Sequence, residues 1–117
     1  MKLLDIEGIK AAFAEHMMIH RGYSPDEAAI AVSDFPDPYE NCYLDEDYVG
    51  ECEIEGEAYE QRACYTVFWR IGMDDVPAFR FYTYYRRSDI PNNKVGEYRN
   101  AKKWYQVDGL ETADFPG

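Results

Sequence analysis

The sequence lacks positive charge over one long stretch. Between Gly22 and Gln61 it contains 13 Asp and Glu residues and no Lys or Arg. The rest of the chain does not share this bias, because residues 62–117 hold seven acids and nine bases. A negative field of this kind repels nucleic acid and anionic membranes and attracts basic partners. The composition therefore favours a basic protein surface as the partner, without direct contact with nucleic acid or membrane.

Long apolar segments and paired cysteines are also missing. No stretch approaches the ~20 apolar residues that a membrane-spanning helix needs. Asp5 and Glu7 interrupt the start of the chain before the apolar core of a secretory signal could form. The three cysteines, Cys42, Cys52 and Cys64, leave one unpaired in any disulfide scheme. These absences predict a cytoplasmic protein with reduced cysteines.

Motifs that carry catalysis are absent as well. The chain has no Gly-rich phosphate loop, no GxSxG and no HExxH. A nucleophilic pair could be assembled from Cys64 with His16 or His20, but no local pattern marks a nucleophile. Carboxylates for an acid–base pair are abundant, as they are in any acidic protein. We therefore expect a protein that works without catalysis and without a cofactor.

The chain does contain enough apolar material for one folded domain. It has 117 residues, including 11 Tyr and six Phe, and no internal repeat or linker divides it. Domains of roughly 100–150 residues are typical. We expect a single domain over residues 1–108. Residues 109–117 show no periodicity and are predicted to form a loose C-terminal tail.

The N-terminal part has the pattern of two helices. Apolar residues recur at helical spacing within residues 5–21, where one face would carry Ile6, Ile9, Phe13 and Met17. Gly22 is placed to end this helix. Ser24 and Glu27 then form a capping box, with Pro at the first helical position, which predicts a second helix over about 25–34. Two helices with a tight turn between them make a helical hairpin.

From Tyr48 onward the apolar period changes from 3.6 to two, which indicates strands. Strands are predicted at 48–58, 62–71 and 77–87, with a turn at 72–75. Residues 97–107 fit either a helix or a strand, and the aromatic pair at its end favours a strand over 102–107. The sequence thus predicts an α+β fold in which an N-terminal helical hairpin packs on an antiparallel three- to four-stranded β-meander.

The alternation in the first predicted strand places a row of acids on one face. The row consists of Glu51, Glu53, Glu55 and Glu57, at a step of ~6.6–6.8 Å per two residues. Asp45, Glu46 and Asp47, in a turn leading into the strand, extend the negative field. Such a row could imitate a nucleic-acid backbone and occupy a basic groove. It could equally be the solvated face of an edge strand, where charge prevents edge-to-edge aggregation.

The third predicted strand carries the opposite pattern, with aromatic residues interleaved with arginine. One face would hold Arg80, Tyr82, Tyr84 and Arg86, opposite Phe79, Phe81, Thr83 and Tyr85. Such a face can stack single-stranded nucleic acid. It can also form a protein contact, because Tyr and Arg are enriched at binding hot spots, or its arginines can pair internally with the glutamates. Exposure of this aromatic face would also leave room for a homodimer.

Two groups of residues could in principle hold a metal. His16 and His20 lie one helical turn apart, and Cys42 and Cys52 could complete a zinc site, but no CxxC pair supports it. The acidic run at 45–47 lacks the alternating ligands and the Gly of a calcium loop. We predict no metal site, and two surface histidines beside Met17 and Met18.

These features together predict a non-enzymatic binding protein that blocks a basic, nucleic-acid-binding surface of a partner protein. In size, acidity and lack of catalytic motifs the chain is similar to small phage or mobile-element proteins that counter host defences, such as anti-CRISPR and antirestriction proteins. The alternatives are another protein-binding module, such as an immunity protein or an adaptor, and a single-stranded nucleic-acid binder using Tyr82 and Tyr84. The predicted partner-binding residues are Asp45, Glu46, Asp47, Glu51, Glu53, Glu55, Glu57, Tyr82, Tyr84 and Arg86.

Overall fold

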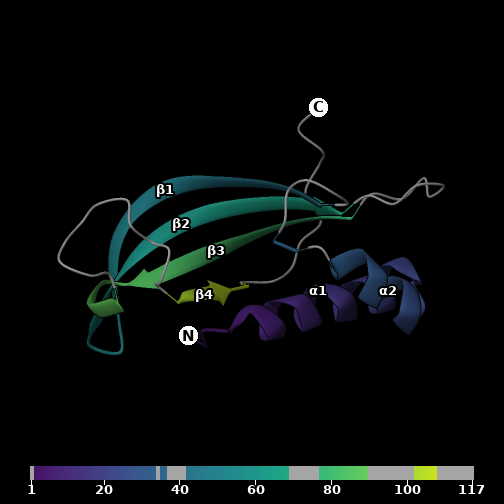
Figure 1. The fold of residues 1–117 in the computed structure, drawn as a ribbon, viewed down its shortest axis with the longest axis horizontal. Coiled ribbons are helices and arrows are strands. Elements are labelled where there is room, and N and C mark those ends of the chain that lie inside the picture. Colours follow the sequence, from purple (N-terminus) through teal and green to yellow (C-terminus); the bar gives the residue numbers. More distant parts are fainter. Residues whose placement is uncertain (1, 34, 37–41, 69–76, 90–101, 108–117) are drawn as a thin grey trace.

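A computed structural model describes residues 2–33, 35–36, 42–68, 77–89 and 102–107. Two helices precede four strands, and the strands form one antiparallel sheet in the order β1-β2-β3-β4, which confirms the predicted α+β class (Figure 1). The elements are α1 (Ile6–Arg21), α2 (Pro25–Val32), β1 (Cys42–Ile54), β2 (Glu57–Phe68), β3 (Ala78–Arg86), the short 3-10 helix η1 (Arg87–Asp89) and β4 (Lys103–Gln106). The turn predicted at 72–75 and the tail predicted at 109–117 lie outside the described residues.

Both helices begin and end where the sequence provides caps. Asp5 caps α1 by accepting a hydrogen bond of 2.8 Å from the Gly8 amide, and Gly22 ends the helix with a left-handed φ of 71°. The predicted capping box of α2 is present. The Glu27 amide donates to the Ser24 hydroxyl at 3.1 Å, and the Ser24 amide donates to the Glu27 carboxylate at 3.0 Å.

The first strand differs from its predicted position. A turn at Glu55 and Gly56, with φ of 51° and 81°, separates β1 from β2 within the range predicted as one strand. Positive φ at both central residues is the geometry of a two-residue hairpin turn whose twist matches the flanking strands. The prediction of one strand over 48–58 is therefore wrong. β1 instead begins at Cys42 and includes the acidic run 45–47 that was expected to be a turn.

A β-bulge divides β1. Tyr48 pairs with Arg62 and Gly50 pairs with Gln61, so Val49 is an extra residue with no partner in the register. Gly50 has φ of 155°, a conformation that residues with a Cβ rarely adopt. The inserted residue shifts the alternation by one position. Tyr48 consequently lies on the face opposite Cys52, whereas regular alternation would place both on one face.

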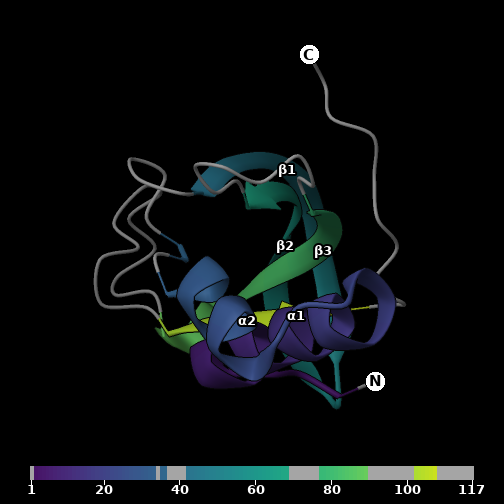
Figure 2. The ribbon, with the colours of Figure 1, turned by 90° about the vertical axis from the view of Figure 1, so that its right-hand side faces the viewer.

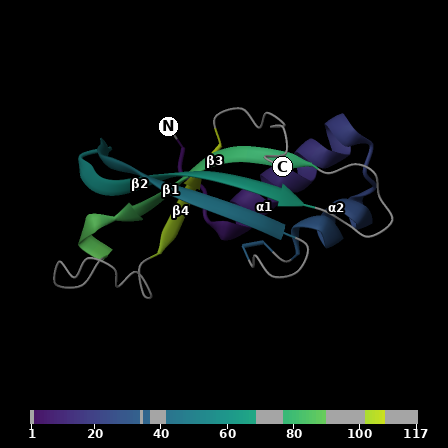
Figure 3. The same ribbon diagram turned by 90° about the horizontal axis from the view of Figure 1, so that it is seen from above.

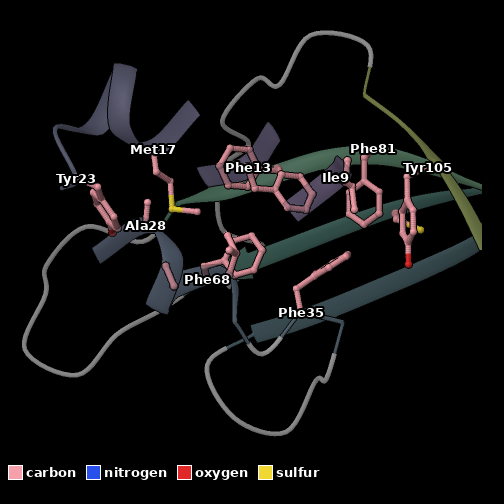
Figure 4. Close-up of a cluster of buried hydrophobic side chains, with 13 residues drawn as sticks. Ile9, Phe13, Met17, Tyr23, Ala28, Phe35, Phe68, Phe81 and Tyr105 are labelled. Atoms are coloured by element: carbon pink, nitrogen blue, oxygen red, sulfur yellow. The ribbon is translucent and has the colours of Figure 1, made fainter. Parts of the chain in front are cut away.

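The core lies between the helices and one face of the sheet. Phe13 of α1 is fully buried and stacks on Phe79 of β3 with ring centroids 4.9 Å apart, and it also contacts Phe35 and Phe81 (Figure 4). Figures 1 and 2 show the long strands arching over the helices, which occupy one end of the arch. The opposite face of the sheet holds a smaller cluster of Ile54, Tyr59 and Tyr84.

The two ends of the sheet are therefore built differently. Seen from above, the helices lie at the end toward which β2 runs, and the β1–β2 turn lies at the far end (Figure 3). Beside β4, Leu4 exchanges two backbone hydrogen bonds with Tyr105, at 2.7 and 2.8 Å. This contact places the segment before α1 against β4 and leaves β1 as the outer strand of the described sheet. No helix in the described ranges is long and apolar enough to cross a membrane.

Candidate protein-binding surface

The hairpin of β1 and β2 carries most of the exposed acidic side chains of the described sheet. We call its segment from Leu44 to Ala58 the acidic hairpin. It has no Lys or Arg. Its exposed carboxylates belong to Asp45, Asp47, Glu51, Glu53, Glu55 and Glu57. They are the residues from which a negative surface can be built.

These carboxylates do not form the single row that the sequence predicted. Glu51 and Glu53 lie on the face that the helices cover farther along the sheet, because they pair with Glu60 and Ala58. Glu55 lies in the turn, and Glu57 begins the next strand. The prediction of four glutamates on one face is wrong because the turn at 55–56 ends the strand after Glu53. The bulge at Val49 also moves Glu51 and Glu53 to the face opposite Asp45 and Asp47. The acids instead surround the outer edge and the tip of the hairpin.

Asp45 and Asp47 lie on the other face of β1, away from the helices. They line a shallow hollow of about 180 Å³ together with Tyr65 and the exposed Arg80. In the register, Asp45 is opposite Tyr65, which is opposite Arg80 on the next strand. The guanidinium of Arg80 thus belongs to the same side of the sheet as these two carboxylates, two strands away from them.

Internal ion pairs neutralise part of the acidic hairpin. The Arg86 guanidinium lies 3.3 Å from the Glu57 carboxylate, and the Arg87 guanidinium contacts the Glu51 carboxylate. Both arginines come from the end of β3 and the start of η1. Within the described ranges, no cation forms an ion pair with the remaining exposed carboxylates, Asp45, Asp47, Glu53 and Glu55. These four are therefore the main source of the local negative field.

Two large apolar side chains are exposed among these acids. Tyr48 is 62% exposed and Val49 is 52% exposed, and both lie at the bulge in the middle of β1. Sequence reasoning missed this pair because regular alternation assigns Tyr48 to a buried face. The Gly directly after them was the one available signal of a bulge.

Glu46 does not belong to the exposed surface, contrary to prediction. It lies on the inner face of β1, only 21% exposed, and its carboxylate accepts hydrogen bonds from Thr83 at 3.3 Å and Arg62 at 3.4 Å. Lys103 lies 3.8 Å from its other oxygen. Glu46 therefore ties together all four strands from within, and its charge is locally balanced.

The same inner polar cluster contains a buried glutamate and an aromatic ring. Glu60, 5% exposed, lies 3.3 Å from Arg62. The Tyr85 ring lies beneath two cations, at 5.1 Å from the Arg62 guanidinium and 5.3 Å from the Lys103 ammonium. Charge-assisted bonds of this kind are strong where water is excluded. The cluster lies on the same face of the sheet that the helices cover farther along. Beyond the helices, ion pairs replace apolar contacts between the strands on this face.

Cys64 adjoins this cluster and has no features of a nucleophile. Its sulfur lies 3.5 Å from the Thr83 hydroxyl, and its side chain is buried in the core. Burial raises the pKa of the Cys64 thiol to about 11, although the hydrogen bond to Thr83 acts in the opposite direction. The thiolate is the reactive form, so little of it exists near neutral pH.

The predicted Tyr and Arg face is largely occupied by internal contacts. The alternation itself is confirmed, since Phe79 and Phe81 face the helices and Tyr84 faces away. Tyr84 is only 1% exposed and its hydroxyl is hydrogen-bonded to Gln61 and Gln106. Its ring is therefore not available to stack on a nucleic-acid base.

Arg86, the arginine of this face that was predicted to contact a partner, is also engaged. Arg86 contacts Asp89 at 3.1 Å and Glu57 at 3.3 Å. The hydrogen bonds to these two carboxylates raise the pKa of Arg86. Tyr82, the third predicted contact residue of β3, keeps a half-exposed side chain and packs against the cluster of Ile54, Tyr59 and Tyr84. The contact predicted through Tyr82, Tyr84 and Arg86 has little free surface there.

The two histidines of α1 do lie side by side, with ring centroids 4.4 Å apart. His16 also packs edge-on against Phe79 at 5.2 Å. Burial lowers the pKa of His16, and the nearby charges of His20 and Arg21 lower it further. Cys52, proposed as a third ligand, lies instead beside the second cluster on the other face of the sheet. Among the described residues, no group of three or more potential ligands could hold a metal ion.

Comparisons of this chain with protein-family models, with curated proteins and with solved structures find no significant match.

Proposed function

We propose that this protein acts by binding, and that the acidic hairpin docks on a basic surface of a partner protein. The observation that carries the proposal is the combination of four carboxylates without internal ion pairs among the described residues, Asp45, Asp47, Glu53 and Glu55, with the exposed Tyr48 between them. Charge steers the partner and fixes orientation, while a large exposed aromatic ring provides area that can be buried.

The arrangement of charges supports a local binding role over a general solubilising one. Glu46 and Glu60 show that this fold can pair its acids internally when the charge is needed for stability. The four unpaired carboxylates lie away from Arg62 and Lys103, the cations that balance Glu46 and Glu60. They are found instead around the edge and tip of the hairpin. Like charges placed so close together repel and oppose folding. A partner that supplies Lys or Arg would relieve this repulsion on binding.

The partner surface is, in our proposal, one that normally holds nucleic acid. Such surfaces carry the dense Lys and Arg that neutralise phosphates. Asp45 and Asp47, two residues apart on one face of β1, present negative charge at a step of ~6.6–6.8 Å, which is broadly similar to that of a nucleic-acid backbone. Bound there, the protein excludes the nucleic acid, as small anti-defence inhibitors of phage and mobile elements do.

The proposal is tested by charge reversal with a matched control. In the first variant Asp45, Asp47, Glu53 and Glu55 are replaced by Lys. In the second, Glu7, Glu15 and Asp26 of the helices and the exposed helical residues Ala11 and Ala29 are replaced by Lys, so that net charge changes equally and the Asp5 cap is kept. Proteins captured from the source cell by the unaltered chain are identified by mass spectrometry, and capture by both variants is compared.

We expect the unaltered chain and the helix variant to enrich basic nucleic-acid-binding proteins, and the hairpin variant to lose them. The purified captured protein is then bound to a labelled DNA or RNA fragment, and the unaltered chain is added. Release of the nucleic acid is expected. Capture that survives hairpin reversal would contradict the proposed surface, and a ternary complex with nucleic acid still bound would contradict the blocking role.

A further inference from the structure

The strand β1 is both the most acidic strand of the sheet and its outer strand. It pairs with β2 on one side, and among the described residues no other backbone hydrogen bond reaches it. The opposite edge of the sheet is closed differently, because Leu4 bonds to β4 through its backbone there. An outer strand offers a row of amides and carbonyls that can pair with one more strand.

The charges along this edge restrict which strand can be added. Another copy of β1 would place acids of one chain opposite acids of the other, and like charges directly opposite one another are destabilising. An acidic or strictly apolar strand would form no favourable charge pair with Asp45 and Asp47. A strand with Lys or Arg at alternate positions places a cation opposite each of these carboxylates, which stabilises the pair.

The shape of β1 also defines the segment that can be paired. From Cys42 to Tyr48 the register with β2 is regular, and the bulge at Val49 then interrupts it. Bulges locally disrupt a ladder and turn the strand. The available edge is therefore the stretch before the bulge, and Tyr48, 62% exposed, lies at its end as an apolar contact for the added strand.

We propose that the partner contributes an extended Lys- or Arg-rich segment that adds to β1 as a fifth antiparallel or parallel strand of the sheet. This inference rests on the proposed function, since it names the kind of basic segment that the acidic hairpin receives. Backbone hydrogen bonds give the contact its affinity. The carboxylates select basic residues at alternate positions of the added strand and disfavour self-pairing through β1.

The test uses a synthetic peptide of seven residues in which Lys and Val alternate, with both ends blocked. Two derivatives carry N-methyl groups, one on the Val nitrogens and one on the Lys nitrogens. Alternate amides of a strand point to opposite edges, so only one derivative places its methyl groups toward β1. A fourth peptide replaces Val by Gly, which keeps the charge and removes the preference for a strand. Binding is followed by NMR titration of the isotopically labelled protein at low salt.

We expect one N-methyl derivative to bind at least about tenfold more weakly than the parent peptide, and the other to bind nearly as well, because only the first loses two or three ladder hydrogen bonds. Amides of residues 43–48 should shift and exchange more slowly with the parent peptide. The protein variant Asp45→Lys with Asp47→Lys should lose binding, whereas the matched variant Glu7→Lys with Glu15→Lys should keep it.

Equal binding of both N-methyl derivatives would overturn strand addition. If the Gly peptide then bound as well as the others and still depended on Asp45 and Asp47, the acidic surface of the proposed function would stand without it. If none of the peptides bound at low salt, where charge attraction is strongest, strand addition and the acidic docking surface would both be contradicted.

Discussion

The two ends of the same sheet face differ in how they are held together. At the helix end, Phe79, Phe81 and Phe13 pack as aromatic rings with little polar content. At the hairpin end, the same face carries Glu46, Arg62 and their neighbours. The stabilisation from apolar burial does not depend on nearby charges. A buried charge stabilises the contact between strands only when an opposite charge lies beside it. One end of the molecule is thus stabilised by apolar burial, and the other by matched charges on the inner side of the sheet.

The largest expected effect comes from the helix end. Phe13→Ala removes a fully buried ring that contacts four others. We expect a loss of about 3–5 kcal/mol in the free energy of unfolding, measured by denaturant titration. Tyr48→Ala is the matched aromatic truncation at the hairpin end, and it should change stability by no more than about 0.5 kcal/mol. Similar losses in both variants would remove the distinction between the two ends.

The bulge of β1 provides the next prediction. Gly50→Ala places a Cβ on a residue with φ of 155°, although no atom lies within 4 Å of that Cβ. The cost is therefore backbone strain alone, about 1–3 kcal/mol, and it should appear in thermal and denaturant unfolding. Gly56→Asn in the hairpin turn is the control, because Asn tolerates the left-handed region that this position occupies. An equal or larger loss at Gly56 would contradict a strained bulge.

A smaller effect is expected from the inner polar cluster. Glu46→Gln keeps the shape of the side chain and removes the charge that faces Arg62 and Lys103. Because these groups are about one-fifth to one-quarter exposed, we expect a loss of only about 1–2 kcal/mol. Asp47→Asn, one residue along and facing outward, should change stability by less than about 0.5 kcal/mol. If Asp47→Asn destabilised the fold as much, the division between inner and outer acids would be wrong.

The smallest effect concerns pH at the helix end. Burial and the neighbouring His20 and Arg21 lower the pKa of His16 below its ordinary value of 6.5. The unfolded chain therefore takes up a proton at higher pH than the folded one. The stability that neutral His16 contributes is fully present above about pH 6.5, and it is lost as the pH drops toward the lowered pKa of the folded state. In His16→Gln the free energy of unfolding should fall less steeply with decreasing pH. In His20→Gln, which removes a charge beside His16, the fall should remain but occur at a different pH. An unchanged slope in His16→Gln would contradict the assignment.

The fold was predictable where local signals agree with one another. The capping box at Ser24, the helical spacing of Ile9, Phe13 and Met17, and the alternation around Phe79 each appear in the structure as the sequence predicts. These elements depend on residues close together in the chain. Their physical causes, hydrogen bonding at a helix end and burial of one face, act locally and leave a regular pattern.

The candidate surface was less predictable because its geometry depends on two irregularities. A Glu-Gly turn breaks the glutamate row, and one inserted residue at Val49 exchanges the faces of β1. Neither irregularity shows in the composition of the segment. A regular strand over 48–58 therefore places Glu55 and Glu57 on the wrong element. The inward turn of Glu46 depends on Arg62 and Lys103, which are distant in sequence. Acidity could be predicted from the sequence, but not the choice of which acids remain unpaired.

The most direct test measures stability and binding together in the hairpin variant, with Asp45, Asp47, Glu53 and Glu55 all replaced by Lys. Removing like-charge repulsion should leave the free energy of unfolding unchanged or raise it, while affinity for the captured basic partner falls by at least a hundredfold, about 2.7 kcal/mol. Equal reversal on the helices should leave that affinity within a few fold. A hairpin variant that stays folded and binds its partner with undiminished affinity would contradict the account.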